Sequence, residues 1–354
     1  MERKIHISAG KEYDAYIGNG LIEKCGEMCR AAGIKGKAAI VTDSIVSPLY
    51  LGKVVKSFRD AGYETVTMEF PAGENYKNIN TFSEILEFFA RSELTRSDFA
   101  VALGGGVVGD IVGFAAGCYM RGIDYVQMPT TLLSAVDSSV GGKTAIDLGV
   151  GKNLAGMFIQ PRIVICDTDT MRTLDESILA DGAAEAIKTG ILGDSGLFEI
   201  LEKGIDLENI VDVITRCISY KGKVVEKDEF ETGIRRKLNL GHTPAHGIEK
   251  RSSYLISHGR AVGMGMAIMT RAAVELGHMT RETADRILKT IENCGLSIGC
   301  PYTAEELAEV AMSDKKRSGD SITIVMPREI GYCTLEKISV SELERIFALG
   351  LEKK

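Results

Sequence analysis

The chain has 354 residues, 45% of them hydrophobic and 26% charged, with a formal net charge of −7 at pH 7. This length predicts two domains, and the acidic balance argues against nonspecific binding to nucleic acid or to a membrane surface. No apolar stretch reaches the roughly 18 residues of a membrane span, none at the start resembles a signal core, and none of the eight cysteines forms a Cys-x-x-Cys pair. We therefore expect a cytoplasmic protein with reduced thiols.

Strand and helix patterns alternate in the first half of the chain. This alternation predicts a mostly parallel sheet covered by helices on both faces, an α/β domain of the Rossmann-like kind. The expected strands are 4–8, 13–17, 38–42, 64–70, 99–103, 125–128 and 163–166. The expected helices are 21–32, 48–61 and 81–91.

Helical patterns dominate after about residue 170. We therefore predict an α/β domain over residues 1–169 and a mainly α-helical domain over residues 170–354. The expected helices are 176–191, 197–203, 210–225, 261–275, 280–294 and 304–312. A hairpin of 321–326 with 333–337 follows, and Ser339 and Glu342 have the spacing of a capping box at the start of a final helix.

A glycine-rich turn follows the strand expected over 99–103. Gly104, Gly106 and Gly109 satisfy the pattern GxGxxG, which lets a pyrophosphate approach amides at a helix N-terminus. A lone match of this kind fits a tight strand–helix turn equally well. Asp43 ends an earlier strand at the edge where such sheets bind ligands, and the loop 71–77 follows the next one. Together these loops favour nucleotide binding.

The sequence Gly142-Lys143-Thr144 has the end of a phosphate-binding Walker A loop. That motif requires a glycine at position 137, where the chain has Asp137. We therefore do not expect ATP hydrolysis.

Three of the five histidines, His242, His246 and His258, fall within 17 residues. His242 and His246 share a helix face, and although a single such pair is more often filler, a third histidine nearby favours a metal site. A catalytic zinc takes three nitrogen or oxygen ligands, and Glu185 is the expected acidic one. Glu185 and Lys188 form either a surface ion pair or, since small apolar residues flank them, a buried pair that requires a metal and an anion as partners.

Several segments, in the same order along the chain, resemble the core motifs of the 3-dehydroquinate synthase family of sugar-phosphate cyclases. They are 103–110, 128–131, 137–143, 151–153, 185–190, 228–235, 238–246 and 257–259, and the similarity extends from Asp43 to the run 314–316. The resemblance implies a dehydroquinate synthase-like fold, in which a Rossmann-like NAD-binding domain precedes a mainly helical domain.

The resemblance also implies an NAD- and metal-dependent carbon–oxygen lyase of the shikimate pathway, leading to aromatic amino acids. Its substrate, a small phosphorylated sugar acid, is 3-deoxy-D-arabino-heptulosonate 7-phosphate, and its products are 3-dehydroquinate and phosphate. In that family a hydroxyl is oxidised by NAD, phosphate leaves by β-elimination, the hydride returns, and ring opening and an aldol step close the carbocycle.

By the family pattern, Glu185, His242 and His258 hold zinc or cobalt. His246 is then not a ligand, contrary to what its spacing from His242 suggests, and assists proton transfer with Glu231 as a second acid/base. The implied NAD contacts are Asp43, Glu74, Lys77, Gly105, Gly106, Asp110, Thr130, Thr131, Lys152 and the segment Thr170 to Thr173.

The residues implied to contact the substrate include several lysines and arginines. An acidic protein needs such positive charges at the site where it binds an anionic ligand. Lys221 and Arg235 bind the substrate carboxylate, and Asp137 and Lys188 orient ring hydroxyls. The residues expected at the phosphate are Lys143, Asn153, Asn239, His246, Lys315 and, from a neighbouring subunit of a homodimer, Arg121.

The chain departs from the family pattern in three segments: at Asp175, at Asp181 and Ala183, and at Pro244 and Ala245. Pro244 is compatible with a first helical turn. The alternatives are a 2-deoxy-scyllo-inosose or valiolone synthase, a metal-dependent polyol dehydrogenase, and a non-catalytic NAD-binding protein. Lys221, Arg235 and Asn239 argue against the first of these. The phosphate-binding lysines argue against the second, and the metal ligands against the third.

Overall fold

The computed structural model describes residues 2–315 and 320–352, except for the side chains of 312–315. It divides into two compact units. The first contains the residues up to Leu174 and the segment Lys221–Phe230, and the second contains Asp175–Tyr220 and the residues from Glu231 onward. The boundary predicted between residues 169 and 170 stays a prediction. That prediction assigned the segment Lys221–Phe230 to the second domain, whereas this segment belongs to the first unit.

A seven-stranded sheet forms the centre of the first unit, in the order β1-β2-β9-β6-β5-β3-β4. β1 is antiparallel to β2, and the other neighbouring strands are parallel. The strands are β1 Arg3–Ser8, β2 Glu12–Gly18, β3 Ala38–Asp43, β4 Thr65–Phe70, β5 Phe99–Gly104, β6 Asp124–Pro129 and β9 Ile163–Asp167. The carboxyl ends of the parallel strands therefore lie along one edge, as predicted.

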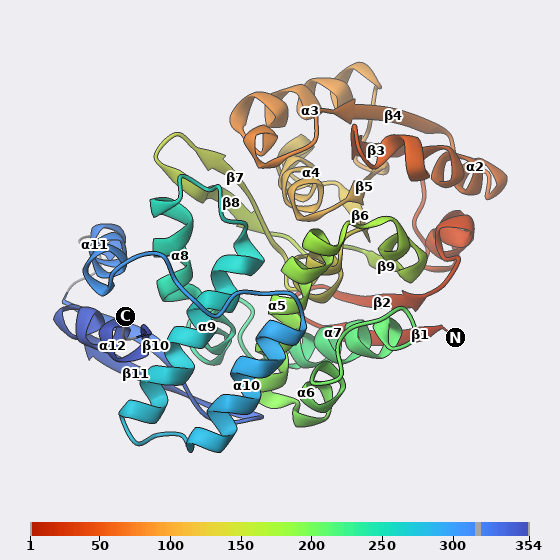
Figure 1. Cartoon of the computed structure of the whole chain (residues 1–354). Coiled ribbons are helices and arrows are strands. Elements are labelled where there is room, and N and C mark those ends of the chain that lie inside the picture. The colour runs from red at the N-terminus through yellow and green to blue at the C-terminus, as the bar shows by residue number, and fades with distance from the viewer. Residues whose placement is uncertain (1, 316–319, 353–354) are drawn as a thin grey trace. The chain divides into compact units, whose positions relative to one another are not determined.

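The central strand β3 is buried on both faces because its apolar side chains alternate between two cores. Ile40 packs in a core with Phe58, and Val41 packs in the opposite core with Phe89. The helices that supply these cores lie on the two faces of the sheet (Figure 1). They are α1 Cys25–Ala31 and α2 Gly52–Asp60 on one face, and α3 Ile79–Arg91 and α4 Gly106–Cys118 on the other. The α/β prediction is confirmed.

A second, two-stranded sheet of β7 (Lys143–Leu148) and β8 (Gly151–Phe158) was not predicted. Most of β8 is exposed, so its sequence lacks the alternation of apolar and polar residues that marks a half-buried strand.

The returning segment Lys221–Phe230 is hydrogen-bonded to both ends of the first unit. Glu226 accepts a hydrogen bond from the amide of Ser8 at 3.0 Å, and Glu229 accepts one from the amide of Gly10 at 2.8 Å. The Glu229 carboxylate also accepts from the Gln160 side chain at 2.8 Å. These contacts complete the β1–β2 hairpin with residues from the distant end of α7 (Ile210–Lys227).

The second unit is mainly helical, as predicted. Its helices are α5 Glu176–Gly193, α6 Ser195–Leu201, the first part of α7, α8 His242–Arg251, α9 His258–Glu275, α10 Arg281–Asn293, α11 Ala304–Lys315 and α12 Leu343–Gly350. Most of α9 is buried, so α9 is the central helix around which α5, α8, α10 and α12 pack.

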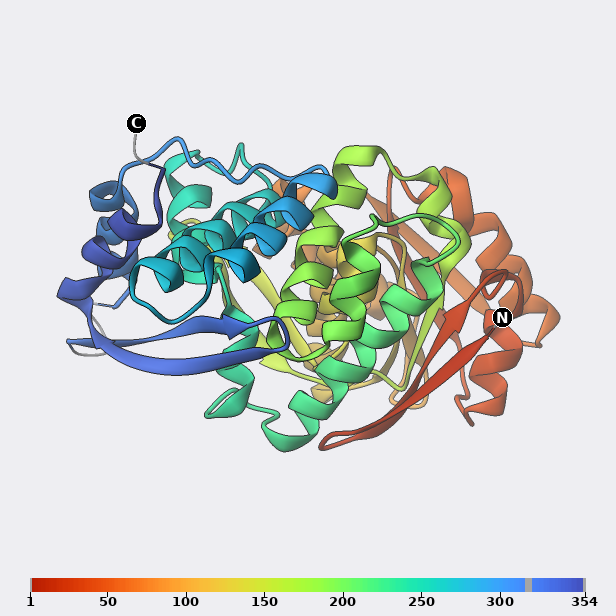
Figure 2. The ribbon, with the colours of Figure 1, turned by 60° about the horizontal axis from the view of Figure 1, so that its bottom comes forward.

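A hairpin of β10 (Ser321–Glu329) and β11 (Tyr332–Ser339) packs against helices α5 and α9 of the second unit (Figure 2). The predicted capping box of Ser339 and Glu342 is present at the short helix that leads into α12. Among the helices of residues 2–315 and 320–352, none has both the length and the apolar composition needed to cross a membrane.

Candidate metal centre and nucleotide site

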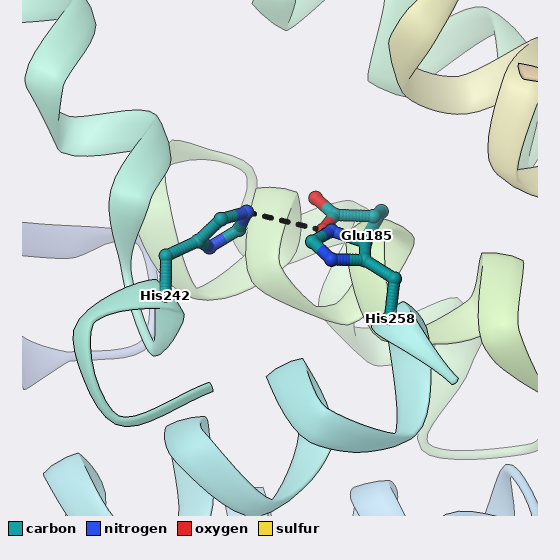
Figure 3. A group of neighbouring side chains, drawn as sticks. All are labelled: Glu185, His242 and His258. Atoms are coloured by element: carbon teal, nitrogen blue, oxygen red, sulfur yellow. Dashed lines mark ion pairs between the residues drawn. The ribbon is translucent and has the colours of Figure 1, made fainter. Parts of the chain in front are cut away.

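Glu185, His242 and His258 lie together in the second unit. Glu185 lies in the middle of α5, and the two histidines are the first residues of α8 and α9. Glu185 Oε1 is 3.6 Å from His242 Nε2 and 3.4 Å from His258 Nε2, and one ligand atom of each residue lies within 4.8 Å of the others. Figure 3 shows both imidazole rings beside the Glu185 carboxylate.

Close packing of the three helices brings these residues together. A Cβ on Gly265 of α9 would lie 2.1 Å from the carbonyl oxygen of Gly241, which precedes α8 with a φ of 76°. A Cβ on Gly259 would lie 2.2 Å from the carbonyl oxygen of Asp181 on α5. The Asp181 side chain, one of the departures from the family pattern, accepts a hydrogen bond from Ser257 Oγ at 2.6 Å. The start of α9, and with it His258, is thereby attached to the helix that carries Glu185.

Pro244 does not interrupt the helix that carries His242. α8 begins at His242, so Pro244 lies in the first turn, where no backbone N–H is needed for the helix. The amide of Ala245 begins the intrahelical ladder by donating to the Gly241 carbonyl at 3.1 Å. The expected tolerance of this proline is confirmed.

The group fits a divalent metal because it offers one carboxylate oxygen and two imidazole nitrogens, the three-ligand set of many catalytic metal sites. Glu185 is only 1% exposed and forms an ion pair with buried Lys188, so the interpretation of a surface pair is wrong. Burial, followed by the positive charge of Lys188, lowers the pKa of His242 to about 3. Burial alone would lower the pKa of His258, but hydrogen bonds to Glu185 and Glu249 raise it to about 10.

Binding of zinc is expected to release about one proton per metal ion at pH 7.5. His258, with a pKa of about 10, is protonated at this pH and must lose the proton to become a ligand, whereas His242, with a pKa of about 3, is already neutral. Metal affinity should therefore rise about tenfold per pH unit between pH 7 and 9. Calorimetric titration in buffers of different ionisation enthalpy measures the proton, and a pH-independent affinity over this range would contradict the prediction.

His246 lies one turn after His242 on α8 and is exposed. The centroids of the two rings are 5.9 Å apart, but His246 does not belong to the described group of three ligand atoms. The spacing of four residues therefore indicated the wrong partner for His242. The third residue of the candidate metal group is His258, from the next helix. The role of His246 in proton transfer stays a prediction.

The segment before α8 brings two further predicted residues together. Asn239 Nδ2 donates to Glu231 Oε1 at 2.6 Å, and Glu231 has a φ of 59°, a left-handed conformation that is uncommon for residues other than glycine. Arg235, between them in the sequence, is 1% exposed and is the largest fully buried side chain among the described residues. Lys315 ends α11, and its side chain lies outside the described residues.

In the first unit, the glycine turn joins β5 to α4 as predicted. Gly105 is the N-cap of α4 and supplies no side-chain hydrogen bond to the helix. The buried hydroxyl of Thr130, at the end of β6, has no hydrogen-bond partner among the described residues, and the Thr130 amide donates to the Gly104 carbonyl at 3.0 Å. Thr131 instead caps the following helical turn through Ser134. An uncapped helix N-terminus beside an unused hydroxyl fits a pyrophosphate group.

Four residues of the predicted NAD set form two ion pairs, one largely buried and one partly exposed. Lys77 Nζ is 2.5 Å from Asp110 Oδ2, and Lys152 Nζ is 3.4 Å from Glu74 Oε1. Burial would lower the pKa of Lys77, but the carboxylates of Asp110 and Glu74 raise it. Lys77 also donates to Asn153 Oδ1 at 2.6 Å, so a residue predicted to bind the substrate phosphate lies within this group.

The remaining predicted NAD residues have partners within the first unit. Asp43 Oδ1 accepts from the amide of Ile45 at 2.9 Å, and Thr170 Oγ1 donates to the carbonyl of Asp167 at 2.7 Å. Thr173 Oγ1 lies 2.5 Å from the hydroxyl of Tyr50. Their contacts with NAD stay predictions.

The remaining predicted substrate residues of the first unit lie in different environments. Lys221 Nζ donates to both the backbone carbonyl and the Oδ1 of Asp137, each at 2.7 Å. Lys143 is exposed at the start of β7. Arg121 is exposed on a turn where both it and Met120 have positive φ angles, of 70° and 51°.

Two acidic residues at these sites were missed. Glu249 Oε1 lies 3.5 Å from His258 Nδ1, and Asp147 Oδ1 accepts from the amide of Asn153 at 2.8 Å. Glu249 follows His246 by three residues, a helical spacing that could have indicated it. No signal in the sequence distinguishes Asp147 from a surface carboxylate.

Comparison with known proteins agrees with this arrangement. The family models described as 3-dehydroquinate synthase N-terminal and 3-dehydroquinate synthase C-terminal match residues 67–181 and 182–317. The 3-dehydroquinate synthase of Vibrio atlanticus (strain LGP32) is 40% identical over 340 residues, which cover 94% of each chain. The chain belongs to the 3-dehydroquinate synthase family. A second member, from Geobacter sp. (strain M21), is 40% identical over 348 residues and 96% of each chain.

Solved structures of related cyclases share the fold of this family. A 2-deoxy-scyllo-inosose synthase complexed with carbaglucose-6-phosphate, NAD+ and Co2+ has a TM-score of 0.89 at 24% identity, over 99% of this chain and 100% of its own. A 2-epi-5-epi-valiolone synthase from Streptomyces hygroscopicus subsp. jinggangensis 5008, with NAD+ and Zn2+ bound, has a TM-score of 0.87 at 25% identity, over 97% and 98% of the two chains.

Proposed function

We propose that the protein is a 3-dehydroquinate synthase that converts 3-deoxy-D-arabino-heptulosonate 7-phosphate to 3-dehydroquinate and phosphate. The observation that carries this proposal is the group formed by buried Glu185 and half-buried His242 and His258, in a chain that matches 3-dehydroquinate synthases over nearly its full length. Its cofactors are NAD and a divalent metal, zinc or cobalt, as in the related cyclases.

The residues of the chain divide into those that hold the cofactors and those that contact the substrate. Glu185, His242 and His258 hold the metal, and the uncapped turn at Gly105 and Gly106 receives the pyrophosphate of NAD. When bound, NAD accepts and returns a hydride, and the metal polarises the oxygen of the reacting hydroxyl.

Cationic and proton-transferring side chains then act on the substrate. Lys188 donates a hydrogen bond to a ring hydroxyl, and its burial beside Glu185 keeps its position fixed. His246 and Glu231 move the proton during elimination. The lysine and asparagine side chains proposed at the phosphate stabilise the charge that develops on the leaving group. They are Lys143, Asn153, Asn239 and Lys315.

We also propose that the protein is a cytoplasmic homodimer in which Arg121 contacts the phosphate of the neighbouring subunit's substrate. The exposure of Arg121 and the left-handed backbone on which it lies support this proposal, since such strain is retained mainly where it has a function.

The test of the function is phosphate release from 3-deoxy-D-arabino-heptulosonate 7-phosphate with catalytic NAD, with and without a chelator, while NADH is monitored. Release that requires NAD and metal, forms dehydroquinate and leaves no net NADH is the expected result. Release only from glucose 6-phosphate or sedoheptulose 7-phosphate would indicate one of the other cyclases. Steady accumulation of NADH on a polyol would indicate a dehydrogenase.

Arg235→Lys is expected to lower kcat/KM roughly ten- to a hundredfold, because lysine keeps the charge but loses the planar two-donor geometry that matches a carboxylate. Binding of NAD and metal should remain near the parent values. Alanine would be the poorer test, since Arg235 is the largest fully buried side chain and its removal would leave a cavity. Steady-state kinetics and metal titration check the result, and loss of metal from Arg235→Lys would contradict the assignment.

A further inference from the structure

His258 faces a carboxylate on each side of its ring. Its Nε2 lies 3.4 Å from Glu185 Oε1, and its Nδ1 lies 3.5 Å from Glu249 Oε1. Glu249 is 6% exposed, and burial of a carboxylate is costly unless polar partners compensate it. The ring of His258 is a polar partner that compensates the burial of the Glu249 carboxylate.

His242 shows the same arrangement with a different outer partner. Its Nε2 faces Glu185 Oε1 at 3.6 Å, and its Nδ1 lies 3.1 Å from the backbone carbonyl of Leu240. Both histidines thus direct Nε2 toward Glu185, and each Nδ1 has an acceptor behind it. The acceptor is a neutral carbonyl for His242 and a carboxylate for His258.

The backbone carbonyl of Glu249 takes part in the turn that follows α8. Glu249 lies on α8, two turns after His242, and its carbonyl accepts from the amide of Tyr254 at 2.7 Å and from Ser252 Oγ at 2.9 Å. These bonds close the turn through which the chain leaves α8 and returns to begin α9 at His258. Glu249 therefore closes this turn with its carbonyl and faces the first residue of α9, His258, with its carboxylate.

We propose that Glu249 is the positioning residue of His258: it accepts a hydrogen bond from Nδ1–H, fixes the tautomer that presents Nε2 to the metal, and makes this histidine the more strongly donating of the two. Outer carboxylates of this kind orient metal-bound histidines and increase their basicity. The inference rests on the proposed metal site. It adds a residue that binds neither the metal nor the substrate.

The test compares Co2+ binding to the full-length parent, Glu249→Gln, Glu249→Ala and the control Glu309→Gln. Glutamine retains an acceptor oxygen without the charge, and alanine removes both. Glu309 lies on α11 and pairs with Arg251, the last residue of α8, so its variant removes a carboxylate that contacts α8 but does not face His258. Affinity is measured by competition with a chelator, and the visible absorption bands of bound Co2+ report the ligand geometry.

We expect Co2+ affinity to fall about tenfold in Glu249→Gln and about a hundredfold in Glu249→Ala, with shifted cobalt bands, and to remain unchanged in Glu309→Gln. A merely structural Glu249 would lower the melting temperature while leaving the affinity and the cobalt spectrum of the folded protein as in the parent, which would overturn the inference. If the alanine variant does not fold, the near-isosteric glutamine variant still decides. If the parent itself binds no Co2+, the proposed metal site fails and not this inference alone.

Discussion

Glu185→Gln is expected to lose the metal and to lower kcat/KM by at least about a thousandfold, because a bound metal contributes several kcal/mol to stabilisation of developing charge. Glu185 supplies the oxygen that both His242 Nε2 and His258 Nε2 face, at 3.6 and 3.4 Å. A glutamine there has similar volume but no charge to balance a divalent ion. Metal content by atomic spectroscopy and phosphate release measure the two effects.

NAD binding by Glu185→Gln should stay near the parent value, because Glu185 is not among the proposed NAD residues. The assignment of Glu185 as a metal ligand would be wrong if the purified variant retained stoichiometric metal at a chelator concentration that leaves the metal of the parent in place.

Lys188→Met is expected to change metal affinity in the opposite direction. The ammonium of Lys188 forms a buried ion pair with Glu185, so its removal leaves the carboxylate without this cation and should destabilise the metal-free protein by about 3–5 kcal/mol. A divalent ion then replaces the lost positive charge, and its affinity should increase about tenfold or more as the repulsion by Lys188 disappears. Turnover should nevertheless fall, because the proposed donor to a ring hydroxyl is absent.

The clearest measurement for Lys188→Met is the gain in melting temperature on addition of zinc, which should exceed that of the parent. Lys289→Met on the exposed face of α10 is the matched control, and its zinc-dependent gain should equal the parent's. A Lys188→Met variant with weaker zinc binding than the parent would show that Lys188 supports the metal site in a way that its charge does not explain.

Much of the fold could be predicted because its signals are local. The strands β3 and β5 are short apolar runs, and the alternation with helices specifies a parallel sheet. The strand β8 escaped prediction because most of its side chains are exposed, so no apolar period distinguishes it from a loop.

The candidate site could be predicted where its residues belong to recognisable motifs, and it could not where they depend on the path of the backbone. The pairing of His258 with Glu249 arises because the chain turns back after α8, and the pairing of Lys77 with Asp110 joins residues that are 33 positions apart. Helical spacing alone favoured His246, since it cannot show that the start of α9 packs closely against α5. Distances along the sequence indicate neighbours on one helix, whereas these pairs join different elements.

The return of Lys221–Phe230 to the first unit has a consequence for the order in which the protein can mature during synthesis. Glu226 and Glu229 accept hydrogen bonds from the amides of Ser8 and Gly10. Lys221 donates hydrogen bonds to Asp137. When the residues up to Leu174 have left the exit tunnel, every strand of the large sheet has emerged, but the residues that anchor its first hairpin have not. The amino-terminal unit can be completed only after residue 230 has left the exit tunnel, when the segment Asp175–Tyr220 of the second unit has already emerged.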